Sequence, residues 1–164
     1  MISAKKKLAM QILRDMAIAA IATFLVLHVF FRIVVVDGES MQPTLQNGDL
    51  LLIQCTKEIQ REDIIVCKPD GYDGYLVKRV IGIEGDVVDI DFESGTVSVN
   101  GLTLYETYIM EPTHKNMGAE FPLTVSTDHL FLLGDNRNNS HDSRSPDIGQ
   151  VNRECVIGKL ISKI

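Results

Sequence analysis

The stretch YLVKRVIGIEGDVVDIDFESGTVSVNG, residues 75–101, decides the fold class of this chain. Three short runs within it are rich in Val and Ile, as β-strands require: Tyr75–Ile83, Val87–Phe92 and Thr96–Val99. Residue pairs typical of tight turns follow these runs: Gly85-Asp86, Ser94-Gly95 and Asn100-Gly101. We therefore expect consecutive strands joined by short turns.

The same pattern extends over the rest of the chain after residue 36. Four further runs read as strands: Asp49–Cys55, Asp63–Lys68, His129–Leu133 and Cys155–Ile161. No segment there has a sustained helical period, and the continuous apolar strands predict that both faces are buried. We expect one mainly β domain over 37–164, a sandwich or folded barrel, with a surface loop at Glu111–Phe121.

An apolar run of 21 residues, 16–36, precedes this domain and predicts a transmembrane anchor. About 20 residues of helix cross the core of a bilayer. Arg32 lies near one end, where a long cationic side chain can reach the headgroups, and His28 is expected to be a tolerated interfacial residue. The β-branched residues after Arg32 also suit the first strand of the next domain, so the end of the helix stays open.

Basic residues lie on the N-terminal side of the span: Lys5, Lys6, Lys7 and Arg14. The positive-inside rule then predicts a single-pass protein of the cell membrane, with residues 1–15 in the cytoplasm and 37–164 outside. A cleaved signal peptide begins in the same way. It needs small residues just after the apolar core, however, and residues 30–34 offer none.

Charge divides along the same border. Residues 1–36 carry five basic and one acidic side chains, a net charge of +4, and the whole chain carries -6, so residues 37–164 carry -10. This acidic domain argues against nucleic acid as a partner, since phosphate binding needs clustered Lys and Arg.

The three cysteines, Cys55, Cys67 and Cys155, fit no metal-binding spacing. Cys55 and Cys67 lie in apolar runs, which favours small buried hydrophobic side chains. A Cys55–Cys67 bridge is the alternative, because an exterior domain can be in an oxidising compartment.

Ser40 follows the span in the sequence GESMQPTL, residues 38–45. Gly38 permits backbone angles closed to other residues, and Pro43 fixes its own φ. A rigid loop that another backbone can approach closely suits a nucleophile. Taken alone, the motif is equally that of an ordinary turn with a surface serine.

Lys78 lies in the strand predicted at Tyr75–Ile83, on one face with Leu76 and Val80, while Arg79 points to the other face. Burial among aliphatic side chains penalises the charged form of a lysine and lowers its pKa. A neutral lysine can accept the proton of a serine hydroxyl. The alternative is a half-exposed strand whose lysine reaches water.

The sequence GDNRNNSHDSR, residues 134–144, follows the apolar strand 130–133. Its many matched donors and acceptors predict a hydrogen-bonded structural loop. Asp142 can pair with Arg144, and Asp135 with Arg79 or Arg137. Ser140 can donate to or accept from the lysine amine.

Together these three segments resemble type I signal peptidase, a family of serine–lysine endopeptidases. The GESMQPTL loop, the strand KRVIG at 78–82 with Gly85-Asp86 after it, and the GDNRNNSHDSR loop occur in the family's order behind an N-terminal anchor. The resemblance spans about residues 15–162, and the length is similar to that of the compact, single-anchor bacterial members. It implies a mainly β fold with one transmembrane helix, in which a coiled β-sheet forms a partly open barrel shared with LexA-type peptidases.

The resemblance also implies residue roles. Ser40 would be the nucleophile, Lys78 the general base, and Ser140 would orient the Lys78 amine. Four charged residues would brace the site: Arg79, Asp135, Asp142 and Arg144.

The backbone N–H of Ser40 would form part of the oxyanion hole. Some members have a serine two residues before the nucleophile, whose hydroxyl also binds the oxyanion, and here that position is Gly38. The second donor would be a Gly38 backbone group, a water or nothing. His141 suggests a Ser-His-Asp triad, but the lysine already supplies the base. No cofactor and no metal is implied.

The implied substrate is the signal peptide of an exported preprotein, cut after small residues, and the bilayer is the second partner. One alternative is a self-processing LexA-like regulator, although such proteins carry a DNA-binding module where this chain has its apolar run. The other is an inactive membrane-tethered β domain that only binds a partner.

Overall fold

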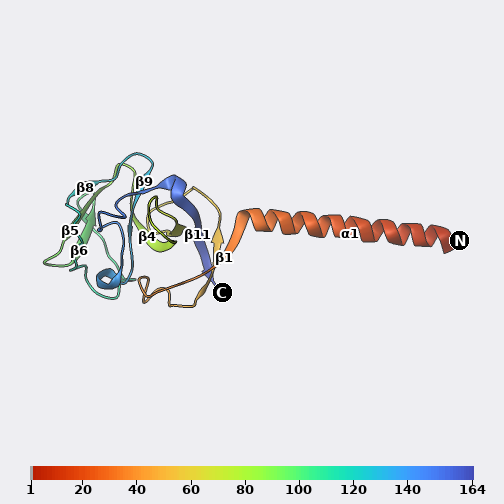
Figure 1. The fold of residues 1–164 in the computed structure, drawn as a ribbon, viewed down its shortest axis with the longest axis horizontal. Coiled ribbons are helices and arrows are strands. Elements are labelled where there is room, and N and C mark those ends of the chain that lie inside the picture. The colour runs from red at the N-terminus through yellow and green to blue at the C-terminus, as the bar shows by residue number, and fades with distance from the viewer. Residues whose placement is uncertain (1) are drawn as a thin grey trace.

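The computed structural model of the chain describes residues 2–164, with side chains from residue 6 onward. Helix α1, Ile2–Phe30, extends away from a folded β domain (Figure 1). Its part Lys6–Phe30 has a mean hydropathy of 1.8 and is long and apolar enough to cross a membrane. None of its most apolar part is buried against the rest of the protein. A membrane anchor leaves its apolar side chains exposed in this way, whereas a core helix of a globular protein is buried.

Strand β1, Phe31–Val35, follows α1 without a linker and pairs with β2, Leu50–Gln54. Within the span expected over 16–36, the helix ends at residue 30 and residues 31–35 form a strand. The β-branched side chains of this segment had left that alternative open. Such side chains restrict χ1 and favour extended backbone.

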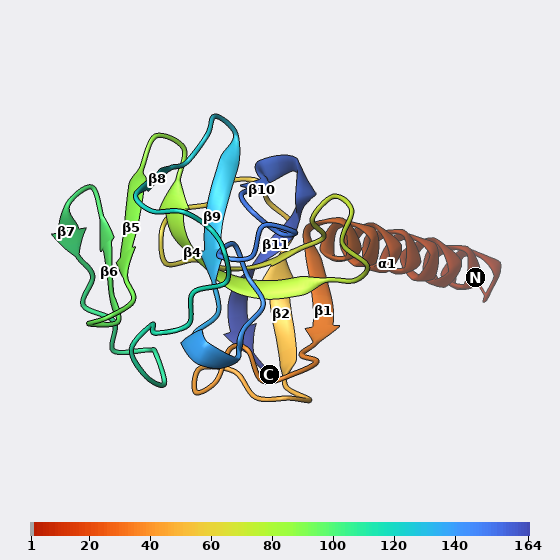
Figure 2. The ribbon, with the colours of Figure 1, turned by 60° about the vertical axis from the view of Figure 1, so that its left-hand side comes forward.

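The larger of two sheets has seven antiparallel strands in the order β1-β2-β11-β3-β4-β9-β10. Its other strands are β3 (Ile64–Cys67), β4 (Leu76–Ile83), β9 (His129–Leu133), β10 (Val151–Asn152) and β11 (Val156–Lys163). Shifts of register in β4 and β11 bend their strands. The sheet curls into a half barrel with β1 and β10 at its edges, which confirms the expected coiled, partly open β fold (Figure 2).

A smaller antiparallel sheet has the order β7-β6-β5-β8. Its strands are β5 (Val87–Asp91), β6 (Thr96–Val99), β7 (Leu102–Thr103) and β8 (Leu123–Thr124). It lies at the side of the domain away from α1 (Figure 2). Its inner residues pack on Ile81, Phe131 and Leu133 of β4 and β9, so the two sheets share one core.

The seven strands that the sequence predicts all form, each within two residues of its expected limits. Glu111–Phe121 contains no strand and is mostly exposed, as expected of a loop. Two single-turn 3-10 helices, η1 (Arg137–Asn139) and η2 (Arg153–Cys155), complete the described chain. The three cysteines are free thiols, and Cys67 packs near Cys155, so the alternative Cys55–Cys67 bridge is not formed.

Candidate active site

Ser40 lies in the loop between β1 and β2, and this loop is fixed by its own apolar side chains. Met41 and Leu45 are 1% and 2% exposed and belong to the core cluster under β1, β2 and β3. The Leu45 N–H donates to the Met41 carbonyl at 2.9 Å, which closes the turn after Ser40. Gly38 has φ +99°, the left-handed region that only glycine enters at little cost. The serine is therefore held by a rigid turn, as the sequence predicts.

Lys78 meets Ser40 directly. Its Nζ lies 2.7 Å from Ser40 Oγ and 3.1 Å from the Val77 carbonyl oxygen. Lys78 is in the middle of β4 and only 3% exposed. The two residues are 38 positions apart in the sequence, and the fold brings their reactive atoms into hydrogen-bond contact.

Burial lowers the pKa of the Lys78 amine below its ordinary value of 10.5. The carboxylate of Asp142 opposes this shift, as do Cys67 and Asp135, while the guanidinium of Arg144 adds to it. Arg79, the next residue in β4, points to the other face of the strand as the alternation predicts, and it pairs with Asp135. Desolvation is the largest effect, so the amine is biased toward its neutral form.

The loop 134–144 is the structural loop that its composition predicts. Asp142 and Arg144 form a fully buried two-point ion pair, with both N···O distances 2.8 Å. The same carboxylate accepts the Gly134 N–H at 3.1 Å. Ser143 pairs with Leu132 of β9 through two hydrogen bonds of 3.0 Å, so the end of the loop is held against the sheet.

Ser140 is buried beside the loop that carries Ser40, residues 38–45, which we call the nucleophile loop. Its hydroxyl has no hydrogen-bond partner among the described residues. The implied contact with Lys78 is thus not formed as a hydrogen bond in this structure. Gly134 explains the close packing here. A Cβ on Gly134 would lie 2.2 Å from Ser140 Oγ and 2.5 Å from the Ser40 carbonyl oxygen. Only glycine lets the three segments meet.

Asp135 pairs with Arg79 and not with Arg137. The two N···O distances are 2.8 and 2.7 Å, and both groups are buried. The Thr44 hydroxyl donates to the same carboxylate, so Asp135 ties β4 to the nucleophile loop. Tyr108 covers the Arg79 guanidinium, with 3.9 Å between Arg79 Cζ and the centre of the ring.

Several supporting contacts were not found from the sequence. Asn136 donates from its backbone to the Ser40 carbonyl at 3.0 Å and from its side chain to the Glu39 carbonyl at 3.1 Å. Arg137 is completely buried and pairs with Glu106, at 2.8 Å from Nη1 to Oε2. Glu106 precedes a segment without periodic signal, so nothing in the sequence linked it to a loop 31 residues later.

The two oxyanion candidates differ in the structure. The Ser40 N–H has no hydrogen-bond partner within residues 2–164. The Gly38 N–H donates to Asn47 Oδ1 at 2.9 Å, inside the loop. Of the two backbone donors, only that of Ser40 is available for an incoming carbonyl in this conformation.

A cleft of about 590 Å³ lies in front of Ser40 and Lys78. The cleft is lined on one side by the end of β1 and residues 37–41, and on the other by the segment 72–78. It therefore runs between two extended segments of the chain. His141 lines it, but its Nε2 pairs with Asp147 at 2.8 Å, and its ring stacks on Tyr72. A Ser-His-Asp triad is therefore not formed.

Within residues 2–164, no three His, Cys, Asp or Glu side chains are grouped so as to hold a metal ion. The structure places at the cleft a serine hydroxyl, a desolvated lysine amine and the Ser40 backbone N–H, which has no partner within the described residues.

Comparison with known proteins agrees with this arrangement. Residues 9–164 match the family described as signal peptidase, peptidase S26. The chain is 33% identical over 165 residues to signal peptidase I P of Bacillus subtilis subsp. natto, covering 94% of this chain and 88% of the relative. A probable signal peptidase I-2 of Synechocystis sp. is 37% identical over 134 residues, covering 76% of this chain and 58% of the relative.

A crystal structure of a signal peptidase I from Enterococcus faecalis aligns with a TM-score of 0.52 and 31% identity, over 63% of this chain and 97% of that one. The order of the three motifs, the Ser40–Lys78 contact and the match over residues 9–164 lead to one assignment. The chain belongs to the signal peptidase family, peptidase S26.

Proposed function

We propose that this protein is a membrane-anchored signal peptidase I, which removes signal peptides from exported preproteins with a serine–lysine dyad. The observation that carries the proposal is the 2.7 Å contact between Ser40 Oγ and the buried Nζ of Lys78. A serine hydroxyl is a weak nucleophile, and an adjacent base of suitable pKa activates it.

In the proposed reaction, neutral Lys78 takes the Ser40 proton as Oγ attacks the scissile carbonyl carbon. The tetrahedral oxyanion accepts the Ser40 N–H. On collapse the C–N bond breaks, and the leaving amine of the mature protein takes the proton from Lys78. A water then gives a proton to Lys78 as its oxygen attacks the acyl carbon. When this second tetrahedral intermediate collapses, the C–Oγ bond breaks and Ser40 Oγ takes the proton from Lys78, so the dyad returns to its starting state.

The surrounding charges keep this pair aligned. The Asp142–Arg144 pair, through Gly134, and the Asp135–Arg79 pair, through Thr44, hold the two loops that meet at Ser40. Among the described residues, the hydroxyl of Ser140 is the buried side-chain group that has no hydrogen-bond partner. The family resemblance implies that this hydroxyl orients the Lys78 amine during the reaction.

The cleft suits an extended peptide. Strand β1 is the edge of the larger sheet, and its end lines the cleft opposite residues 72–78. A substrate strand that enters there can form backbone hydrogen bonds with an exposed edge.

The anchor places this chemistry at a bilayer. Helix α1 would cross the cell membrane once, with its basic start in the cytoplasm and the β domain outside. Enzyme and substrate would then share one surface, which raises their effective concentration.

Cleavage in trans tests the proposal. Detergent-solubilised protein is incubated with a preprotein or an Ala-x-Ala peptide, and we expect cleavage after the second Ala. Ser40→Ala and Lys78→Met should abolish it, while the matched changes Ser126→Ala and Lys159→Met, at residues that do not line the cleft, should not. Cleavage confined to the protein's own chain would instead support a self-processing regulator, and no cleavage at all a binding module.

A further inference from the structure

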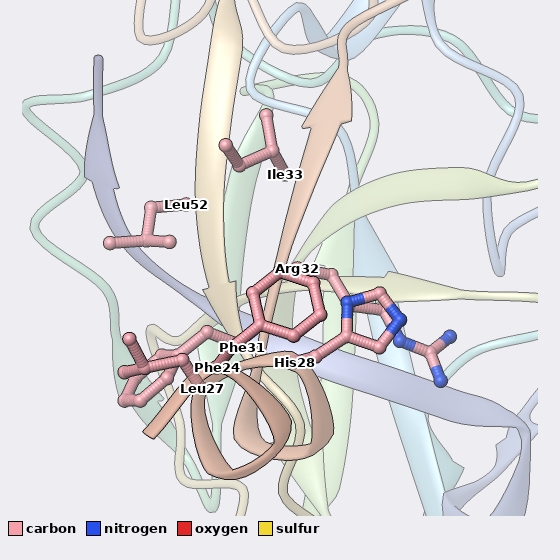
Figure 3. A pocket seen from close by; sticks show the side chains of 7 residues that line it. All are labelled: Phe24, Leu27, His28, Phe31, Arg32, Ile33 and Leu52. Atoms are coloured by element: carbon pink, nitrogen blue, oxygen red, sulfur yellow. The ribbon is translucent and has the colours of Figure 1, made fainter. Parts of the chain in front are cut away.

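The junction of α1 and the larger sheet has a groove that catalysis does not use. It measures about 750 Å³ and is lined by Phe24, Leu27, His28, Phe31, Arg32, Ile33 and Leu52. Figure 3 shows the aromatic and aliphatic side chains on one side, and His28 beside Arg32 on the other. The groove thus has an apolar wall and a cationic end.

The outer face of the adjoining strands is apolar as well. Ile33 of β1 pairs with Leu52 of β2, and Val35 pairs with Leu50. Ile33, Val35 and Leu50 are 65%, 60% and 43% exposed. The opposite face of β2 packs in the core through Leu51 and Ile53. A sheet face in contact with water is normally polar, so this face is built for an apolar environment.

Arg32 is unusual in its isolation. It is the only Lys or Arg between Arg14 and Lys57. Its guanidinium forms no hydrogen bond or ion pair with any other side chain or backbone group within 2–164, and Arg32 lies two residues after the end of the apolar helix. An exposed guanidinium at headgroup level offers two parallel donors to a phosphate.

We propose that this groove binds one anionic phospholipid, with its phosphate on Arg32 and His28 and an acyl chain along Phe24, Leu27 and Ile33. The inference rests on the membrane location proposed above. Charge decides the occupant: the apolar helix of a signal peptide would satisfy the wall but leave the cationic end without a partner. The attraction is local to Arg32 and acts against the general repulsion between an anionic bilayer surface and a domain of net charge -10.

The chain contains no Trp, which makes a single-Trp experiment possible. Phe24→Trp places the probe in the groove, and Val26→Trp places a matched probe two residues on, at about 200° around the helix, on the opposite face. Both are made in a Ser40→Ala background and reconstituted in vesicles of phosphatidylcholine with dibrominated phosphatidylglycerol or dibrominated phosphatidylcholine. Quenching by the brominated chains reports the lipid next to each Trp.

For Phe24→Trp we expect association with phosphatidylglycerol about fivefold stronger than with phosphatidylcholine, the factor expected for one basic residue at an anionic surface. For Val26→Trp the ratio should be near one. Adding Arg32→Gln should bring the ratio at Phe24→Trp to one, while Arg32→Lys should keep most of it. Because Arg32 is exposed and unpaired within the described chain, neither change is expected to disturb folding.

Equal ratios at the two positions, or a ratio that Arg32→Gln leaves unchanged, would overturn the proposal. Quenching of Phe24→Trp by a signal peptide with a brominated apolar segment, and not by phosphatidylglycerol, would assign the groove to substrate. Since the readout needs no catalysis, a lipid preference without peptidase activity in the Ser40 enzyme counts against the proposed function alone.

Discussion

At the scale of single residues, the site depends on a lysine that is expensive to protonate. The folded pKa of Lys78 is lowered, chiefly by burial, so the neutral base is available at lower pH than in an unfolded chain. Between the folded and the unfolded pKa, the unfolded state binds the proton and the folded state does not. Lys78 therefore lowers the free energy of unfolding in full below its folded pKa, and this cost disappears as pH rises toward 10.5.

The pH dependence of acylation follows. We expect kcat/KM for a peptide substrate to fall as pH drops through the lowered pKa of Lys78, because the protonated amine cannot accept the Ser40 proton. NMR of the lysine side chains, with Lys78→Met to assign the signal, should show one titration well below the others. A Lys78 signal that titrates with the surface lysines would contradict this.

Replacing Lys78 itself gives a second test at this scale. Met has similar length and no charge, so Lys78→Met should keep or raise the free energy of unfolding while cleavage is lost. Denaturant titration at pH 6 and at pH 9 separates these effects, since any gain should be larger at pH 6, where the protonated amine is the costlier form. A large loss of stability at both values would show that Lys78 has a packing role.

Gly134 is the third residue with a sharp prediction. Its added methyl would meet Ser140 Oγ and the Ser40 carbonyl, so Gly134→Ala should displace the nucleophile loop and lower kcat by about 10²-fold, as small misplacements of reacting groups do. Gly82→Ala is the matched control, because its methyl would lie 2.7 Å from Val88 in the core of the smaller sheet. Both should cost about 1–3 kcal/mol of stability, and only the first should lose activity per folded molecule.

At the scale of elements, the segment 105–110 supports the catalytic loops from behind. The Pro43–Ile109 bridge joins it to the Ser40 loop, and the Met110 N–H, which donates to the Asp135 carbonyl at 3.2 Å, joins it to the loop 134–144. Glu106 in this segment holds the buried Arg137. A polar network of this kind is stable only when every buried member is satisfied.

Breaking the network from this segment should therefore be costly. Glu106→Gln leaves Arg137 buried without its counter-charge, which should destabilise the domain by about 3–5 kcal/mol. Glu154, 85% exposed and 3.6 Å from Lys57, is the control, and Glu154→Gln should have little effect. Equal denaturation midpoints for the two variants would remove Glu106 from the support of the site.

The sequence predicted seven of the eleven strands from local signals, and the resemblance to a family, carried by three local motifs, implied the Ser40–Lys78 pair. Each strand has its own run of Val and Ile, and Ser40, Lys78 and the 134–144 loop each carry a recognisable motif. The contacts of Glu106, Tyr108 and Thr44 depend instead on which loops the half barrel brings together, and no local pattern encodes that. The helix end was open for a related reason: apolar β-branched residues suit both a span and a strand, and pairing with β2 decided between them.

At the scale of the whole molecule, α1 and the β domain suit different environments: a lipid bilayer for the apolar helix and water for the domain. The helix buries nothing against protein, whereas the domain has its own three core clusters. We expect the anchor to remain attached in the mature protein, because residues 30–34, where the helix ends, include no small residue. Intact mass of the membrane-extracted protein should match the full chain, and an N-terminus near residue 37 would contradict the anchor.

Orientation can be tested on the same material. In right-side-out vesicles, external trypsin should cleave within the β domain and leave the fragment around Arg14 protected. Inside-out vesicles should give the reverse. Cleavage near Arg14 from outside would contradict the proposed topology.

Because no linker separates α1 from β1, the distance between the end of the helix and the far end of β1 is fixed by the strand. Strand β1 has five residues, which at about 3.3 Å each sets its far end no more than about 17 Å from the end of the helix. In the topology proposed above, Ser40 would therefore stay at a nearly fixed height above the membrane and would not reach a distant scissile bond. Preproteins whose scissile bond emerges too far from the bilayer, or stays too deep within it, should escape cutting whatever their side chains.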